Sequence, residues 1–395
     1  MRKGGDSRVW DAVLITAGFW VLAASLWMDV GYMGATLERI STQSMAFHVD
    51  FDSFWRSARA MLEGQNIYDT GVELVNLNPP VWTVLISPLG LLEPLVAYRV
   101  FVLISLAVVV GYLAWTVEEL RLRPGWAVVG VVMLLFSSPL LATLGLGQVY
   151  PLLALGLVAA WAADRRDRQE FSGAALGLVV ALKPSLLPVL LWPLARRRWR
   201  ALLAALISGA GATLVGVIVL GPATTLDYIE VLRGQQASAY WDNASLPSAA
   251  ARLFTENPYA QNVATLPWMV TLGYALGIVA IILTAAKIRH GPEVGLWALV
   301  AASLLASPIA WHNYLVLLGP GVLLLLARGR AQTAFLLLAL QAIPAQWPLI
   351  WKDRGTVAAS LAMTLYLYIL VAHWLALLAA TREPADGGLA AQKPG

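Results

Sequence analysis

Long apolar runs alternate with short polar segments along this chain, and the pattern predicts a bundle of membrane-crossing helices. Many runs are roughly 17 to 25 residues long, enough to cross about 30 Å of hydrocarbon. Stretches such as "VVGVVMLLF" do not alternate apolar and polar positions, which favours helices over membrane strands. The runs fall near residues 11–30, 78–92, 95–116, 126–143, 148–163, 172–194, 201–220, 266–286, 294–306, 308–327, 332–350 and 356–379. We therefore expect an all-α polytopic membrane protein with about 10 or 11 transmembrane helices, some of them broken or re-entrant.

Composition supports a bilayer environment. Of the 395 residues, 59% are hydrophobic and 13% are charged, against about 25% charged in soluble domains. The absence of cysteine excludes disulfides, thiolate chemistry and cysteine-ligated metals. The net charge of +4 is modest and reflects basic loops rather than a nucleic-acid surface.

The positions of Lys and Arg predict the orientation of the chain. Basic loops favour the cytoplasmic side, so we expect the N-terminus, the loops 164–169, 196–200, 287–290 and 328–330, and the tail 380–395 to lie inside. The outer segments are then a first catalytic loop at 31–77, a second large loop at 221–265 and a turn at 307–312. The first apolar run shows no cleavage site and is interpreted as a retained helix. We expect one integral membrane domain over 1–395 in a bacterial inner membrane.

Two apolar runs do not fit a simple crossing. Both flanks of 172–194 are basic, and Lys183-Pro184 interrupts its centre. Because proline removes a backbone donor and disfavours helix at the preceding residue, we expect a broken or re-entrant pair lining a cavity. The run 78–92 is short and begins with a proline pair, so we expect it not to cross fully.

Polar residues within or beside the apolar runs are candidates for function, because ionisable groups in a membrane are costly. Lys183 could bind an anion or snorkel to an interface. His312, in "SPIAWHNY", could serve a site or belong to an aromatic belt, and Gln148 could cap a helix. Arg252 could be a solvated loop residue, and Asn243 begins a weak N-glycosylation sequon.

Two carboxylates, Asp50 and Asp52, follow the first apolar run in "FHVDFDSFW". In an extended stretch residues two apart point the same way, and a like-charged pair raises the pKa of one member. That arrangement suits a general base or a divalent cation; the alternative is a solvated acidic loop. Carboxylates, cations and aromatic side chains at the outer face together suggest binding of a lipid-phosphate-linked sugar.

Six segments resemble signatures of glycosyltransferase family 87, a GT-C family of polyprenyl-phosphate-sugar-dependent membrane enzymes that includes mannosyltransferases. In this sequence Asn78 stands where the family commonly has tyrosine, and Tyr150 where it has asparagine. The segments are "DFDSFWRSARAMLEGQNIYD" (50–69), "NPPVWTVLISPLGLL" (78–92), "GLGQVYPLLAL" (145–155), "GAALGLVVALKPSLLPVLLWPLARRRWRA" (173–201), "DNASLPSAAARLF" (242–254) and "SPIAWHNYLVLL" (307–318).

The resemblance implies a GT-C-like helical bundle that transfers a sugar, with mannose expected, from a polyprenyl-phosphate donor to a hydroxyl of an envelope glycolipid or glycan, with inversion. Asp50 would be the general base, with His312 as a second catalytic residue that orients the phosphate or the acceptor. Lys183 and Arg252 would bind the donor phosphate. The expected substrate contacts are Asp52, Trp55, Tyr68, Asn78, Gln148, Asn243 and Trp311. No metal or other cofactor is required by this chemistry, and no nucleic-acid partner is expected.

Two alternatives remain open at this stage. A transporter or flippase of lipid-linked sugars would use similar residues, although no internal repeat of the kind common in transporters is visible. A non-catalytic protein that only binds such lipids is the other alternative. The sequence does not give the sugar, the acceptor or the linkage.

Overall fold

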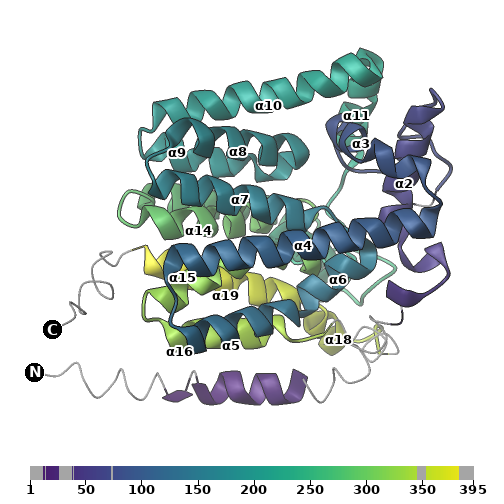
Figure 1. Ribbon diagram of the computed structural model, residues 1–395. Helices are drawn as coiled ribbons and strands as arrows, with labels where there is room; N and C mark the ends of the chain where they lie inside the picture. Colours follow the sequence, from purple (N-terminus) through teal and green to yellow (C-terminus); the bar gives the residue numbers. More distant parts are fainter. Residues whose placement is uncertain are drawn as a thin grey trace, which may run out of the picture. The chain divides into compact units, whose positions relative to one another are not determined.

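The computed structural model describes residues 12–13, 15–25, 38, 40–72, 74–344 and 353–381, and these residues are helical with short connections (Figure 1). Across these ranges the one strand-like pairing is an isolated bridge between Asn243 and Trp311. The predicted all-α fold is confirmed. The expected positions of the N-terminus up to residue 11, of residues 31–37 in the first loop and of the tail from residue 382 lie outside the described residues.

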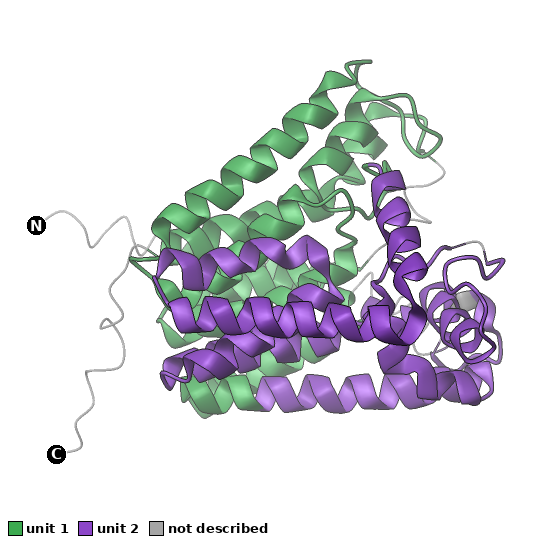
Figure 2. Cartoon of the chain, turned by 90° about the horizontal axis from the view of Figure 1, so that it is seen from above, with its two compact units in different colours: residues 1–34, 115–141, 237–395 green, residues 35–114, 142–236 purple. Residues whose placement is uncertain are grey.

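The chain forms two compact units, each assembled from separate parts of the sequence (Figure 2). Helices α4 (Pro94–Leu120) and α6 (Ser138–Leu146) contribute to both units. Unit 2 otherwise contains η1 (Met45–Phe47), α2 (Val49–Leu62), α3 (Pro80–Ile86), η2 (Ser87–Leu91), α7 (Tyr150–Arg165), α8 (Gln169–Leu182), η3 (Pro184–Leu190), α9 (Leu191–Ala195), α10 (Trp199–Leu220) and α11 (Pro222–Gly234). Unit 1 contains α5 (Pro124–Leu135), α12 (Leu246–Phe254), α13 (Trp268–Lys287), α14 (Pro292–Ala306), η4 (His312–Leu318), α15 (Gly319–Ala327), α16 (Ala331–Gln341), α18 (Val357–Ala362) and α19 (Leu365–Ala380). Whether the units act as one domain stays a prediction.

Close packing of α8 on α10 organises unit 2. Gly173 and Gly177 of α8 lie one turn apart in "GAALG" and face α10, where a Cβ on Gly177 would lie 2.2 Å from the Ala205 carbonyl oxygen. Ser208 Oγ also donates to the Ala174 carbonyl across the same contact, at 2.9 Å. Small residues at this spacing let two helix backbones approach, which is how helices associate in lipid without a hydrophobic driving force.

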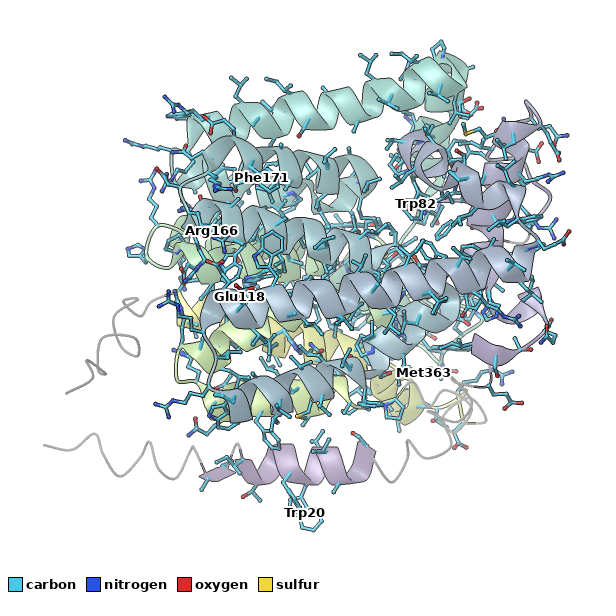
Figure 3. The ribbon with its side chains drawn as sticks, viewed as in Figure 1. Trp20, Trp82, Glu118, Arg166, Phe171 and Met363 are labelled. Atoms are coloured by element: carbon cyan, nitrogen blue, oxygen red, sulfur yellow. The ribbon has the colours of Figure 1, made fainter. Side chains whose placement is uncertain are left out.

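Ion pairs fix which loops of unit 2 share an end. Arg196 Nη1 lies 2.7 Å from Asp164 Oδ2, and Arg198 pairs with Asp167. The start of α8 and the end of α9 therefore lie at one end of the unit, and Figure 3 shows Arg166 at that end of α7. The charge pattern of the sequence predicts this grouping.

The segment between these loops turns back at Lys183. Helix α8 ends at Leu182, Lys183 adopts an extended backbone with φ −144° and ψ 85°, and η3 begins at Pro184. A 14-residue helix rises about 21 Å, less than the hydrocarbon thickness, before η3 and α9 return. The predicted re-entrant break is confirmed, with Lys183 at its apex. The segment of α3 and η2 is likewise a short apolar element, as expected for 78–92.

Unit 1 has the same separation of ends. Arg328 pairs with Glu293 at 3.2 Å and donates to the Ala380 carbonyl. These two contacts bring the start of α14 close to the ends of α15 and α19. Elsewhere in the unit, Asn243 and Trp311 pair, so the loops before α12 and before η4 lie together. The positions of Lys and Arg in the sequence predict the same two groups of loops, one inner and one outer. Which set faces the cytoplasm stays a prediction.

The helix count differs from the expected 10 or 11. In the part of the chain that the structure describes, four helices are long and apolar enough to cross a membrane, or five if the bent pair α5 and α6 forms one span. The four are Pro94–Leu120, Trp199–Leu220, Trp268–Lys287 and Val357–Ala380. Several other apolar runs fold as shorter helices of 10–17 residues. The break at Pro184, which the proline in the sequence predicts, divides one such run into Gln169–Leu182 and Pro184–Ala195.

Lipid-facing surface confirms a multi-pass membrane protein. Helix α10 exposes a row of large aliphatic side chains, and Trp20 points outward with 68% of its surface exposed (Figure 3). Such surface is costly in water and favourable in hydrocarbon. The row consists of Leu203, Ile207, Leu214 and Ile218.

Replacing Gly177 with alanine tests the α8–α10 contact. Gly177→Ala forces a Cβ into the Ala205 backbone, so we expect it to lower the free energy of unfolding by about 1–3 kcal/mol. Gly211→Ala on α10 is the matched control, since a Cβ there meets nothing within 4 Å and helix propensity alone favours alanine over glycine. Thermal unfolding in detergent should place the two variants on opposite sides of wild type. Equal midpoints would show that the contact is not tight.

Candidate functional site

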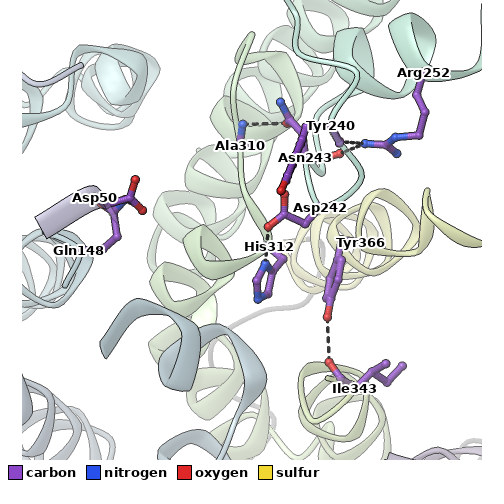
Figure 4. Close-up of polar contacts among 10 residues, drawn as sticks. All are labelled: Asp50, Gln148, Tyr240, Asp242, Asn243, Arg252, Ala310, His312, Ile343 and Tyr366. Atoms are coloured by element: carbon purple, nitrogen blue, oxygen red, sulfur yellow. Dashed lines mark hydrogen bonds and ion pairs between the residues drawn. The ribbon is translucent and has the colours of Figure 1, made fainter. Parts of the chain in front are cut away.

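A tight turn before α7 positions the start of α2. Gly147 has φ +73°, and a Cβ at this position would lie 2.7 Å from Phe51 Cβ. Glycine is therefore required twice, by the backbone conformation and by the close approach of α2. The next residue, Gln148, donates from Nε2 to Asp50 Oδ2 at 2.8 Å (Figure 4). The predicted candidates Asp50 and Gln148 thus lie in contact.

The same turn is fixed to α2 by a buried histidine that the sequence analysis missed. His48 Nδ1 lies 2.8 Å from the Gly145 carbonyl oxygen, and its ring stacks on Tyr98 with centroids 3.6 Å apart. Tyr98 Oη donates to the Leu144 carbonyl. Burial lowers the pKa of His48, which the hydrogen bond to Gly145 partly opposes. A neutral His48 therefore anchors the first turn of the helix that carries Asp50.

The expectation that Asp50 and Asp52 share one face is wrong. Both lie in the first turn of α2, which is a helix and not an extended strand, so residues two apart point about 200° apart. Asp52 pairs instead with Arg56 one turn later, at 3.0 Å. Only Asp50 is directed to the Gln148 turn, where the helix N-terminus favours its negative charge.

Lys183 reaches the same turn from the re-entrant break. Its Nζ lies 5.7 Å from the centre of the Tyr150 ring, within cation–π range. Tyr150 begins α7 two residues after Gln148, so the segment Gly147–Tyr150 contacts both Asp50 and Lys183. A carboxylate and an ammonium group are thereby gathered at one end of unit 2, away from its arginine-rich end.

Three other predicted substrate contacts hold the loop after α2 in place. Trp55 Nε1 donates to the Leu92 carbonyl, and Tyr68 Oη donates to the carbonyl of Asn78. The Asn78 amide in turn donates to Asn76 Oδ1. These bonds give Trp55, Tyr68 and Asn78 structural contacts; a sugar contact for any of them stays a prediction.

In unit 1, Arg252 is completely buried and uses every N–H it has. Its five donors go to the carbonyls of Ala239, Tyr240, Asn243 and Met363 and to Thr364 Oγ1. Burial lowers its pKa to about 10 while the nearby Asp242 opposes the shift, so the group stays charged at neutral pH. The expectation that Arg252 binds the donor phosphate does not fit this geometry, because no donor remains.

Asn243 is a second structural centre, and it joins two loops. Its Oδ1 accepts from the Ala310 amide, and its Nδ2 donates to the carbonyls of Ser238 and Pro308. With 1% of its surface exposed, it offers no accessible glycosylation site in this fold. Its predicted substrate contact is untested, and Trp311, its bridge partner, remains partly exposed beside Tyr240.

The joined loops bring His312 against a carboxylate that the sequence analysis did not select. The His312 amide donates to the Asp242 carbonyl at 2.9 Å, and His312 Nδ1 lies 3.0 Å from Asp242 Oδ2 (Figure 4). Asp242 immediately precedes Asn243 in "DNAS", which was the only signal available. His312 itself is only 4% exposed.

No metal cluster accompanies these pairs in the described part of the chain: nowhere in it do three or more His, Asp or Glu side chains lie close enough together to hold an ion. The expectation that the chemistry needs no cofactor remains untested.

Conservative replacement of Arg252 tests its structural role. Arg252→Lys keeps the charge but cannot supply five planar donors, so buried carbonyls lose partners at about 1–3 kcal/mol each. We expect a lower midpoint of thermal unfolding, with Arg233→Lys on the surface of α11 as an unaffected control. A variant that keeps wild-type stability but loses affinity for polyprenyl phosphate would restore Arg252 to the phosphate site.

Comparison with known proteins identifies the family of the chain. The model of glycosyltransferase family 87 matches residues 76–308, more than half of the chain. This range contains the segments with Asn78, Gln148 and Lys183, whereas the segment 50–69 lies before it.

Three individual proteins are similar to the chain. The polyprenol-phosphate-mannose-dependent alpha-(1-2)-phosphatidylinositol mannoside mannosyltransferase of Mycobacterium tuberculosis is 29% identical over 82% of this chain and 81% of its own length. An alpha-(1->3)-arabinofuranosyltransferase of the same species is 31% identical over 40% of this chain and 38% of its own length. The structure of ArnT from Cupriavidus metallidurans bound to undecaprenyl phosphate aligns over 91% of this chain and 78% of its own, at a TM-score of 0.37 and 15% identity. Because the family model matches more than half of the chain, the chain belongs to glycosyltransferase family 87.

Proposed function

We propose that this glycosyltransferase moves a sugar, in the first instance mannose, from a polyprenyl-phosphate carrier to a hydroxyl of an envelope glycolipid or glycan. The observation that carries the proposal is the contact of the Gly147–Tyr150 turn with Asp50 and with Lys183. One group can accept a proton and the other can stabilise an anion. A transfer from a lipid phosphate to a hydroxyl needs both.

The donor class is supported by the names of the relatives. The mannosyltransferase that aligns over most of the chain is described as polyprenol-phosphate-mannose-dependent. The arabinofuranosyltransferase aligns over a much shorter part. Mannose is therefore the first donor to test and arabinofuranose the second.

In the proposed step the acceptor oxygen attacks C1 of the donor sugar as the bond from C1 to the phosphate oxygen breaks. Asp50 accepts the acceptor proton, and the electron pair of the broken bond leaves with the polyprenyl phosphate. Attack opposite the leaving group inverts the configuration at C1. A carboxylate held by the neutral amide of Gln148 is oriented without losing its charge, which suits a general base.

Lys183 stabilises the leaving group in this account. Negative charge grows on the phosphate oxygen as the glycosidic bond breaks, and a fixed ammonium group placed there lowers the barrier electrostatically. The phosphate itself is a good leaving group, so no general acid is needed. With Arg252 committed to carbonyls, Lys183 is the cation that we assign to the donor.

We further propose that the reaction takes place at the extracytoplasmic face of a bacterial plasma membrane. The arginine-rich end of unit 2 carries Arg196 and Arg198 and, by the positive-inside tendency, faces the cytoplasm. Asp50 and Lys183 lie toward the other end of that unit. Lipid-linked donors suit that face, where nucleotide sugars are absent.

Replacing Asp50 with asparagine tests the general base. Asp50→Asn removes the proton acceptor with little change in shape, so we expect a 10²- to 10⁴-fold loss of turnover with donor binding retained. Asp52→Asn is the matched control, because its pair with Arg56 lies at the surface and contributes about 0.3–0.5 kcal/mol. Transfer of radiolabelled sugar from polyprenyl-phosphate mannose to an envelope glycolipid extract in nanodiscs measures both.

The same assay separates the alternatives. Unchanged transfer in Asp50→Asn would remove Asp50 from its role, whereas loss of transfer in Asp52→Asn as well would support the expected substrate contact of Asp52. Donor binding without transfer by wild type, for mannose and arabinofuranose carriers alike, would favour a flippase or a binding protein. Parallel reactions with EDTA should run at the same rate; a loss restored by a divalent cation would show a metal requirement.

Removing the charge of Lys183 tests the leaving-group contact. We expect Lys183→Gln to lower turnover by about 10²- to 10³-fold and to weaken binding of polyprenyl phosphate. Lys287→Gln, at the end of α13, removes the same charge elsewhere and should leave both quantities unchanged. Wild-type affinity for polyprenyl phosphate in Lys183→Gln would contradict the assignment.

A further inference from the structure

Two buried polar atoms of the Asp242–His312 pair have no hydrogen-bond partner in the described structure. The pair is joined through His312 Nδ1 and Asp242 Oδ2 at 3.0 Å. The outer atoms, His312 Nε2 and Asp242 Oδ1, are both buried and unsatisfied. Buried polar atoms are costly unless they find a partner, so these two atoms are suited to a polar group of a bound molecule.

The charge of this region argues against a phosphate as that ligand. Asp242 is itself anionic, and Arg252, the nearby cation, gives all five N–H groups to other protein oxygens. A phosphate would meet a carboxylate and no available guanidinium. A hydroxyl group suits both atoms, because it donates to a carboxylate oxygen and exchanges a hydrogen bond with either state of an imidazole nitrogen.

One aromatic ring contacts the pair, and others lie on the two loops that carry it. The centre of the His312 ring lies 4.8 Å from that of the Tyr366 ring, and Tyr240 contacts both Trp241 and Trp311. Figure 4 shows the positions of Tyr366 and Tyr240. Burial raises the pKa of Tyr240 to about 12, so its phenol stays a neutral partner. Apolar ring faces beside fixed polar atoms match a sugar, which carries C–H faces and hydroxyl groups.

We propose that Asp242 and His312 form a binding site for the hydroxyl groups of a sugar, and that this pair sets which sugar the enzyme accepts. The inference rests on the proposed function, because it assigns the pair a part of that reaction's substrate. Arg252 and Asn243 are positioning residues in it: they hold the loop that carries Asp242 against the loop that carries His312. The recognised hydroxyls belong to the donor sugar or to the acceptor glycan.

Binding of two lipids distinguishes a hydroxyl site from an anion site. Wild type and Asp242→Asn in nanodiscs are titrated with polyprenyl phosphate and with polyprenyl-phosphate mannose. We expect the variant to lose about 10-fold or more in affinity for the glycosylated lipid and less than about 2-fold for the bare phosphate. If only the acceptor is recognised, both lipids bind normally and the loss moves to KM for the acceptor.

Deoxy sugars then test recognition of hydroxyls directly. One monodeoxy donor or acceptor should lose kcat/KM with wild type, because a site built around a hydroxyl discriminates against its absence. In Asp242→Asn, the kcat/KM for this analogue should equal the kcat/KM for the parent sugar. If Asp242 had only a structural role, its replacement would lower the rate for every analogue by the same factor. The variant would then still discriminate against the deoxy analogue.

Two histidine variants identify the atom involved. His312→Gln can place an amide near the position of Nε2, whereas His312→Asn keeps a group near Nδ1, toward Asp242. We expect the glutamine variant to keep more affinity for the sugar, although it loses the contact with Asp242. Thermal unfolding checks that both variants are folded.

The possible outcomes distinguish failure of this inference from failure of the proposed transferase function. Transfer by wild type, together with equal losses for bare and glycosylated lipid in Asp242→Asn, would make the pair an anion site and overturn the inference alone. Unchanged binding and unchanged discrimination in Asp242→Asn and His312→Asn would leave the pair a structural contact only, and would also overturn it. Wild type that neither binds nor transfers any lipid-linked sugar would overturn the proposed function as well.

Discussion

Hydrocarbon supplies no hydrogen-bond partners, and this constraint governs where the chain can leave helical geometry. Each break must be satisfied from within the protein. At the break before Pro184 the chain turns back and leaves Lys183 at the apex, and at Gly147 a positive φ and a close approach to α2 make the turn. In unit 1 the loop before α12 is held by the guanidinium of Arg252. These breaks therefore carry the polar side chains from which the candidate sites are built.

The hydrogen bonds of these side chains separate structural polar residues from candidate functional ones. Arg252 donates to four backbone carbonyls and to Thr364 Oγ1, and Asn243 donates to backbone carbonyls, so both residues shape the loops. Asp50 is oriented by a neutral amide. His312 and Asp242 satisfy each other on one side only. A polar residue in an apolar chain is thus not automatically a ligand, and its contacts decide its role.

The sequence predicted the helical membrane fold, the break at Lys183 and the grouping of basic loops, because apolar length, proline and charge act locally. It could not predict the face of Asp52, since "DFDSFW" gives no clear period, nor the saturation of Arg252, whose partner Thr364 is 112 residues away. Asp242 was missed because a loop carboxylate has no distinguishing pattern until Asn243 joins its loop to that of His312. Long-range contacts decided the last two, whereas the face of Asp52 follows from the local helix of α2 and its pair with Arg56.

A structure with a non-reactive phosphonate analogue of polyprenyl-phosphate mannose, determined in nanodiscs, tests the central claim most directly. The account predicts C1 of the sugar beside the Asp50 carboxylate, with the phosphonate within hydrogen-bonding distance of Lys183 Nζ. A phosphonate bound to Arg252 after rearrangement of its carbonyl contacts, or a sugar remote from Asp50, would contradict the account.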